Sequence, residues 1–169
     1  VLDKAGIPLA VAADLRLTSP NAIAADYAVE AGRRGLQNAS VTSLISVVLK
    51  DDATQPTNVH AVSDGYPLRG RVRVSDRAFG PPGDVRGVPA PGECWPDSRV
   101  LAALGARVGD VLNVGSTQLR VTQVLISRPD QGSGIVVLAP SLVMNQADLP
   151  ATRLIQPGSR VRYAVLFAG

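Results

Sequence analysis

The sequence predicts an α+β fold in which a β-rich segment, residues 70–128, is inserted into an α/β lobe formed by residues 1–69 and 129–169. Strand and helix patterns alternate as β-α-β-β over the first 65 residues, and a β-α-β order returns after residue 129. Between them, short alternating strands and turn signals replace the helical periodicity. Of the 169 residues, 46% are hydrophobic and 18% are charged, which is enough apolar material for a packed core.

The α/β lobe is expected to hold one helix near its start, at about residues 20–34. Ser19 is suited to cap its N-terminus, and Pro20 suits its first turn. Glu30 and Arg34 lie four residues apart and can pair on the helix surface. Gly35 then fits the C-terminal cap.

Strands of this lobe are expected in runs of aliphatic and β-branched residues, at 11–17, 41–49, 59–62, 135–138 and 161–167. The acid pair at residues 51–52 marks the turn between the second and third runs. A short helix is expected at residues 141–146.

The inserted segment begins with the alternating strand RVRV at residues 71–74. Proline and glycine at residues 80–92 exclude regular structure there. A helix follows at residues 98–104, with Asp97 as its cap. The runs VLNV and LRVTQVLI then predict a hairpin that turns at residues 115–116.

The charge pattern is weakly basic. Fifteen arginines and two lysines face fourteen acidic residues, which gives a net charge of +3. Arg69, Arg71 and Arg73 alternate and would share one face of a strand. Two interpretations are a solvated or guarded strand edge, and contact with anionic lipid headgroups. Nucleic-acid binding is disfavoured, because aromatic residues do not interleave with the basic ones.

The residues of common catalytic sites are missing. His60 is the one histidine, so no second histidine can complete a Ser-His-Asp or Cys-His arrangement, and a structural role is expected for it. Cys94 lacks any metal-ligand spacing around it and is expected to pack. Residues 132–134 lack the Lys-Ser/Thr of a phosphate loop. We therefore expect no catalytic residue, no metal and no cofactor in this domain.

Membrane and targeting signals are also missing within the chain. No stretch approaches the roughly 20 apolar residues that span a bilayer, and no signal peptide is recognised. The chain starts at Val1 without methionine and stops in the apolar run at residues 163–168. We expect a fragment of a longer protein.

Segments along nearly the whole chain resemble one family, the FtsX/MacB-like permeases of ABC transporters, and within it the YbbP type. The segments are DLRLTS at 14–19, RRGL at 33–36, VHAVSDGYPLRG at 59–70, RPDQG at 128–132, LAP at 138–140, MNQADL at 144–149 and QPGSRV at 156–161. The order of these segments carries the resemblance, since each one is short.

The resemblance implies a MacB-like periplasmic core domain, placed between the first and second membrane helices of an inner-membrane permease. Residues 1–69 and 129–169 would form its porter-like lobe, and residues 70–128 its sabre-like lobe. ATP would bind a separate cytoplasmic ATPase subunit, reached through the membrane helices. The YbbP type implies export or extraction of a hydrophobic, lipid-like substrate, or work on a periplasmic partner such as an esterase or thioesterase.

Two other function classes stay open from the residues alone. One is a stand-alone soluble ligand-binding module, and the other is an enzyme that uses cleft carboxylates. For a permease domain, a substrate or partner surface is expected at five residues, each of which has ordinary packing or a turn as its alternative interpretation. These residues are Arg128, Asp130, Gln131, Leu142 and Met144.

Overall fold

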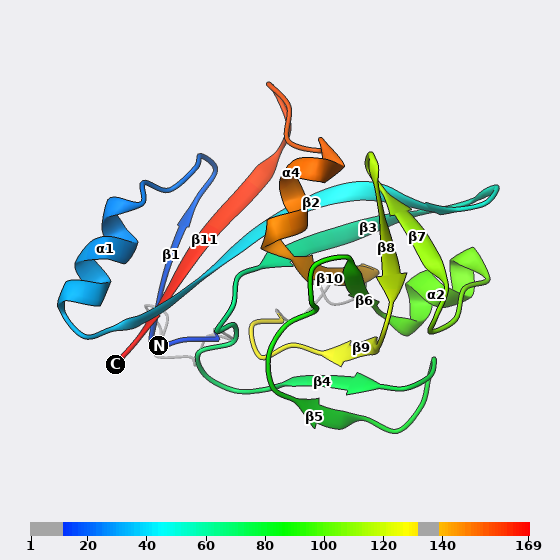
Figure 1. The fold of residues 1–169 in the computed structure, drawn as a ribbon, viewed down its shortest axis with the longest axis horizontal. Coiled ribbons are helices and arrows are strands. Elements are labelled where there is room, and N and C mark those ends of the chain that lie inside the picture. The colour runs from blue at the N-terminus through cyan, green and yellow to red at the C-terminus, as the bar shows by residue number, and fades with distance from the viewer. Residues whose placement is uncertain (1–11, 132–138) are drawn as a thin grey trace.

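The computed structural model describes residues 12–131 and 139–169, and it is a mixed fold of many strands and few helices (Figure 1). The strands are β1 (Leu15–Ser19), β2 (Gln37–Lys50), β3 (Ala53–Val62), β4 (Val72–Ser75), β5 (Gly83–Val85), β6 (Glu93–Pro96), β7 (Val111–Val114), β8 (Thr117–Val121), β9 (Val124–Ser127), β10 (Ser141–Asn145) and β11 (Val161–Ala168). The helices are α1 (Asp26–Arg33), α2 (Ser98–Leu104), the 3-10 turn η1 (Gln146–Asp148) and α4 (Leu149–Thr152). The α+β class is confirmed at this level.

An eight-stranded sheet in the order β1-β11-β2-β3-β10-β6-β8-β7 forms the frame of the molecule. Its last strand, β7, also pairs with β2, with Val48 opposite Val114 and Leu49 opposite Asn113. The six strands from β2 to β7 therefore close into a ring, while β1 and β11 extend the sheet outside it. Closure removes the free edges that an open sheet would expose.

The interior of the ring is an aliphatic core. Successive side chains of a strand point to opposite faces, so alternate residues of each ring strand enter this core. Leu142 and Met144 of β10 are completely buried in it, as are Val59 and Ala61 of β3. The helix α2 adds Val100, Leu101 and Leu104, and α4 adds Leu149.

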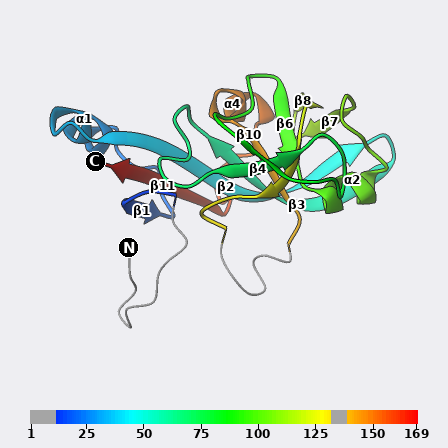
Figure 2. The ribbon, with the colours of Figure 1, turned by 90° about the horizontal axis from the view of Figure 1, so that it is seen from below.

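A second core lies on the other face of the large sheet. There a three-stranded sheet in the order β5-β4-β9 packs against the intervening residues of the ring strands and β11. Tyr66, Trp95, Leu125 and Leu166 are the larger side chains in this layer. Seen from below, β4 crosses the ring strands (Figure 2). The molecule is thus layered. The strands β6 and β10 are buried on both faces, whereas β7 and β8 contribute only to the core inside the ring.

Most expected elements are confirmed by the structure. The runs at residues 41–49, 59–62 and 161–167 lie within β2, β3 and β11, and RVRV lies in and before β4. Asp97 caps α2, since its Oδ1 accepts a hydrogen bond from Val100 N at 3.0 Å. Glu30 pairs with Arg34 at 2.7 Å, and Gly35 follows α1 with a φ of +72°. The run at residues 135–138 lies outside the described residues.

The start of the first helix was predicted wrongly. Ser19 is the last residue of β1, opposite Tyr163 of β11, and its Oγ accepts a hydrogen bond from Asn21 N in a turn. The helix α1 begins only at Asp26, without a side-chain cap. Because Ser19 pairs with β11 as part of β1, it is not available to cap a longer helix. The preceding run at residues 11–17 is β-structure only from Leu15 onwards within the described residues.

Three other elements differ from the sequence interpretation. The helix expected at residues 141–146 is the strand β10, because a short apolar run that is buried on both faces cannot be told from a helix by periodicity. The run LRVTQVLI divides into β8 and β9, which belong to different sheets. The stretch at residues 80–92 contains the three-residue strand β5.

The sequence predicts two lobes, but in the structure strands of both predicted lobes belong to one continuous hydrogen-bonded ring. The strand β6 pairs with β10, and β7 pairs with β2, so strands of residues 70–128 share a sheet with strands from both flanking segments. The boundaries at residues 69/70 and 128/129 stay a prediction. These pairings place strands of both predicted segments in one sheet.

The turn between β7 and β8 packs against the end of α4 and the residues directly after it. A substitution at Gly115 tests this contact. The φ of Gly115 is +56°, and a Cβ there would overlap the backbone oxygen of Thr152, which accepts a hydrogen bond from Ser116 N at 2.8 Å. We expect Gly115→Ala to lower the free energy of unfolding by about 3 kcal/mol, from left-handed strain and overpacking together. Urea denaturation measures the change.

Gly109→Ala is the matched control, because Gly109 has a φ of +99° but no atom within 4 Å of an added Cβ. It is expected to lose about 1–2 kcal/mol from backbone strain alone. Equal losses in the two variants would contradict the close approach at Gly115.

Candidate functional site

A buried charged cluster lies where β1, the segment after β3 and the segment after β9 meet. At its centre is Asp130, whose side chain is 1% exposed. Its Oδ2 accepts a hydrogen bond from Arg16 Nη1 at 3.2 Å, and its Oδ1 accepts one from Arg128 Nη1 at 3.3 Å. Oδ1 also accepts a hydrogen bond from the Tyr66 hydroxyl. The members come from three separate segments, with Arg128 and Asp130 in the same one, so the cluster exists only in the folded protein.

The cluster has one carboxylate for two guanidinium groups. Burial raises the pKa of the Tyr66 phenol, and the neighbouring Asp130 carboxylate raises it further. Tyr66 is therefore a neutral phenol that donates its hydrogen bond to Asp130 Oδ1. The Arg128 side chain is 9% exposed and the Arg16 side chain 21%, so the excess positive charge is largely kept from water.

His60 lies near this cluster on β3 and is half-buried. Its Nδ1 is 2.8 Å from Ser43 Oγ, in a hydrogen bond across the β2–β3 pair. Burial lowers the pKa of His60 well below its ordinary value, and the charges of Arg128 and Arg16 lower it further. The imidazole is therefore neutral near pH 7, and the expected structural role agrees with this setting.

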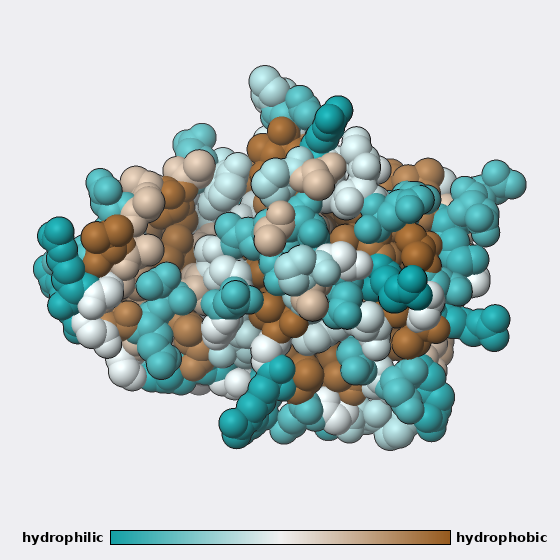
Figure 3. Space-filling view, viewed as in Figure 1, coloured by the Kyte–Doolittle hydropathy of each residue, from teal (hydrophilic) through white to brown (hydrophobic). Residues whose placement is uncertain are grey.

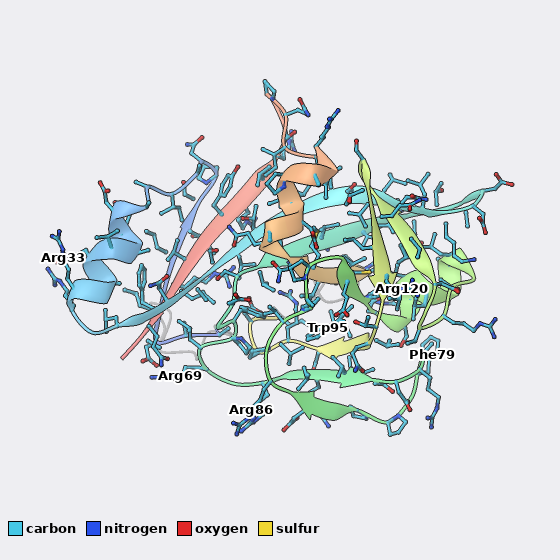
Figure 4. All side chains as sticks on the ribbon, in the orientation of Figure 1. Arg33, Arg69, Phe79, Arg86, Trp95 and Arg120 are labelled. Atoms are coloured by element: carbon cyan, nitrogen blue, oxygen red, sulfur yellow. The ribbon has the colours of Figure 1, made fainter. Side chains whose placement is uncertain are left out.

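An open groove of about 400 Å³ lies on the other side of Tyr66. It is lined by Gly65, Tyr66, Pro67, Gly70, Arg71, Val85, Arg86 and Gly87. Arg71 directly precedes β4 and Arg86 directly follows β5, so the two neighbouring strands place both arginines at one end of the small sheet. Figure 4 shows Arg86 projecting from this end.

Gly70 shows why the groove needs glycine in its wall. Its φ is +76°, and a Cβ at this position would approach Pro129 Cβ to 2.6 Å. The segment before β4 can therefore pass close to the segment after β9, which carries Asp130. The groove and the charged cluster are therefore joined at two points, the contact between Gly70 and Pro129 and the side chain of Tyr66.

Arg69 ties the first and last described strands together next to the groove. Its guanidinium donates to both oxygens of Asp14, at 3.0 and 2.9 Å, and to the backbone oxygen of Gly169 at 2.6 Å. A hydrogen bond from Gly169 N and the Arg69 charge lower the pKa of Asp14. The strands β1 and β11 therefore leave the domain side by side (Figure 1).

The five residues of the sequence-predicted surface lie in two separate places. Arg128 and Asp130 belong to the charged cluster, and Gln131 Oε1 accepts a hydrogen bond from Arg128 N at 3.3 Å. Leu142 and Met144 are fully buried inside the ring, where their alternative interpretation as packing residues fits. A substrate or partner role for the five stays a prediction.

Arg16, Tyr66 and Arg86 were not singled out from the sequence. Arg16 and Tyr66 lie in segments that carry the family resemblance, and this was the signal that could have marked them. Arg86 lies in the Pro/Gly stretch, where no pattern sets it apart. Only the pairing of β4 with β5 brings it beside Arg71.

The remaining chemistry-bearing residue, Cys94, is completely buried in the ring core, and burial raises the pKa of its thiol. Within residues 12–131 and 139–169, no three His, Cys, Asp or Glu residues gather closely enough to hold a metal ion. Among the same residues, no helix has the length and apolar character required to cross a bilayer.

Comparison with known proteins confirms the resemblance to YbbP-type permeases. Over 159 residues, the chain is 33% identical to a protein of Escherichia coli described as an uncharacterized ABC transporter permease, YbbP. The match covers 94% of this chain and 19% of the permease, so the chain spans about a fifth of that relative's length. No protein-family model matches the chain.

Asp130→Asn tests the charged cluster. Because the change leaves two guanidinium groups without their shared counter-charge, we expect a loss of about 3 kcal/mol in the free energy of unfolding. Tyr66→Phe removes one hydrogen bond and should lose about 1–2 kcal/mol. Asp52→Asn, in the exposed β2–β3 turn, is the matched control and should change stability little. Equal midpoints for Asp130→Asn and Asp52→Asn in urea denaturation would contradict the cluster.

His60 predicts a pH dependence of stability. The unfolded histidine binds a proton below its ordinary pKa of 6.5, whereas the folded one stays neutral to lower pH. The stabilisation is therefore complete above pH 6.5 and is lost as the pH falls, at up to about 1.4 kcal/mol per pH unit. His60→Asn should flatten the stability curve between pH 6.5 and 5. An unchanged slope in this variant would assign the pH dependence to other groups.

Proposed function

We propose that this chain is the extracytoplasmic domain of an ABC transporter permease subunit, at the periplasmic face of the inner membrane. In this proposal the domain couples ATP-driven motion of the membrane helices to the export or extraction of a hydrophobic, lipid-like substrate, or to a periplasmic partner. The observation that carries the proposal is the match of 94% of the chain to a segment of a permease.

The topology supports a domain inserted between two membrane helices. Such a domain must begin and end at neighbouring points, because both helices lie in the same bundle. Here β1 and β11 are antiparallel neighbours with Leu15 opposite Phe167, and Arg69 clamps Asp14 to Gly169. A movement of either flanking helix would reach both strands together.

The ring supports the coupling role. Because β2 pairs with β11 over its first half and with β7 near its end, one continuous strand runs from the exit of the domain to the far side of the ring. A displacement of β11 would therefore be carried to the far side by hydrogen-bonded strands. The porter-like segments, 1–69 and 129–169, and the sabre-like segment, 70–128, would follow as one unit.

The proposed role is non-catalytic. ATP would bind a separate cytoplasmic ATPase subunit, and no cofactor is expected in the domain itself. An esterase or thioesterase in the periplasm is a proposed partner that rests on the family resemblance alone.

A stand-alone ligand-binding module is the second candidate function. The open groove of about 400 Å³ beside Arg71 and Arg86 favours it, since a pocket of this size suits a small ligand. The two candidates differ in what the full-length protein carries on either side of the domain, and this difference can be tested directly.

Purification of the full-length protein from membranes, followed by mass spectrometry of what remains bound, tests the proposal. We expect an ABC-type ATPase subunit to be retained, because a permease domain cannot drive transport without one. Retained lipids or a periplasmic protein would narrow the substrate. Recovery of the full-length protein from the soluble fraction without an ATPase would overturn the permease role and favour the binding module.

A further inference from the structure

We infer that the groove between Arg71 and Arg86 is a binding site for a phosphate-bearing anion, such as a lipid headgroup or a free phosphate ester. This inference goes beyond the permease role, because it concerns a ligand of the domain itself. It stands or falls independently of the ATPase.

The charges at the groove favour an anion. The guanidinium of Arg86 has no ion-pair or hydrogen-bond partner that the structure shows within the described residues. Arg71 has only a distant partner, since its Nε is 3.8 Å from Asp84 Oδ2. The same carboxylate also serves Arg73, whose Nε is 3.8 Å from Asp84 Oδ1. Arg71 and Arg73 thus share one carboxylate at long distance, and neither contact is short enough to satisfy its guanidinium group.

The placement of the two arginines also fits phosphate. Guanidinium groups present several donors in a plane and bind phosphate oxygens with paired hydrogen bonds. Because β4 and β5 are antiparallel, the residue before β4 and the residue after β5 lie at the same end of the sheet, with Val72 opposite Val85. The side chains of Arg71 and Arg86 line one groove and can contact one ligand together.

The wall of the groove allows a ligand to approach the backbone. Gly65, Gly70 and Gly87 all have positive φ values, of +88°, +76° and +93°, and they leave this wall without Cβ atoms. Behind it, the cluster of Arg16, Arg128 and Asp130 has an excess of one positive charge. Because the cluster is partly buried, solvent and salt screen its charge less than they would screen an exposed charge. The cluster therefore adds to the attraction for an anion.

The surface around the groove suits a polar ligand with an accessible headgroup. Hydrophilic side chains project from the lower edge of the molecule, over β4 and β5 (Figure 3). Two sources of phosphate fit this geometry, an anionic lipid at a membrane surface and a soluble phosphate ester. Both share the same recognition chemistry, and only binding experiments with separate probes distinguish them.

The test uses the 169-residue chain and two probes. One probe is glycerol 3-phosphate, titrated while the amide resonances are followed by nuclear magnetic resonance. The other is a set of vesicles of phosphatidylcholine, with and without phosphatidylglycerol, in a sedimentation assay. We expect the amides of Gly65, Gly70 and Gly87 to shift, or the chain to sediment only with the anionic vesicles.

The variants Arg71→Gln and Arg86→Gln should each weaken binding about fivefold, the effect expected for removing one basic residue near an anionic surface. Arg160→Gln is the matched control, because it removes the same charge from an exposed position directly before β11. The segment between α4 and β11 lies at the opposite edge of the molecule from β4 and β5 (Figure 1). Asp84→Asn should strengthen binding, since it removes the carboxylate that competes for Arg71.

The outcomes separate the sources and the alternatives. Binding to anionic vesicles alone, weakened by the groove variants, identifies a lipid headgroup. Binding to glycerol 3-phosphate, weakened by the same variants, identifies a soluble phosphate ester. Absence of binding to both probes would overturn the inference, and so would equal weakening by Arg160→Gln, which would indicate attraction to the overall charge.

Discussion

The strand β2 is the constraint on which the rest of the structure depends. Along one edge it pairs with β3 from Val41 to Lys50, and along the other it pairs first with β11 and then with β7. The pairing of Val48 with Val114 closes the ring, and without it the aliphatic interior would be open along one side. Fourteen residues of one strand therefore hold both the open part of the sheet and the closed part.

The second organising feature is the set of buried charges around Asp130. A buried carboxylate is stable only with partners, and here Arg16, Arg128 and Tyr66 provide them from three separate segments. The cluster therefore fixes β1 and the segment after β9 against the turn that carries Tyr66. It also forms the positively charged wall behind the groove. Packing of the second core and electrostatics of the groove are linked at this one tyrosine.

These features together describe a sheet in which the start of β1 and the end of β11 lie at one edge, with a basic groove beside them. Arg69 holds the paired ends, and Gly70 and Arg71, the next two residues, line the groove. In the proposed role, movement of the membrane helices would enter the domain close to the groove, and an anion bound in the groove would lie beside that point. This proximity fits the proposed role in a membrane permease, where headgroups and membrane helices are neighbours.

The sequence by itself determined the local elements with strong signals. The alternation in β2, β3 and β11, the Asp97 cap of α2 and the glycine after α1 follow from chemistry within a few residues of each position. The resemblance of the ordered segments likewise indicated a YbbP-type permease. Tertiary structure decided what depends on distant partners: the strand conformation of Leu142–Met144, the extension of β1 to Ser19, and the convergence of Arg16, Tyr66 and Asp130. The physical reason is that cross-strand pairing and buried polar contacts join distant residues, such as Tyr66 and Asp130, 64 positions apart, and Arg16 and Asp130, 114 positions apart. No local pattern encodes such separations.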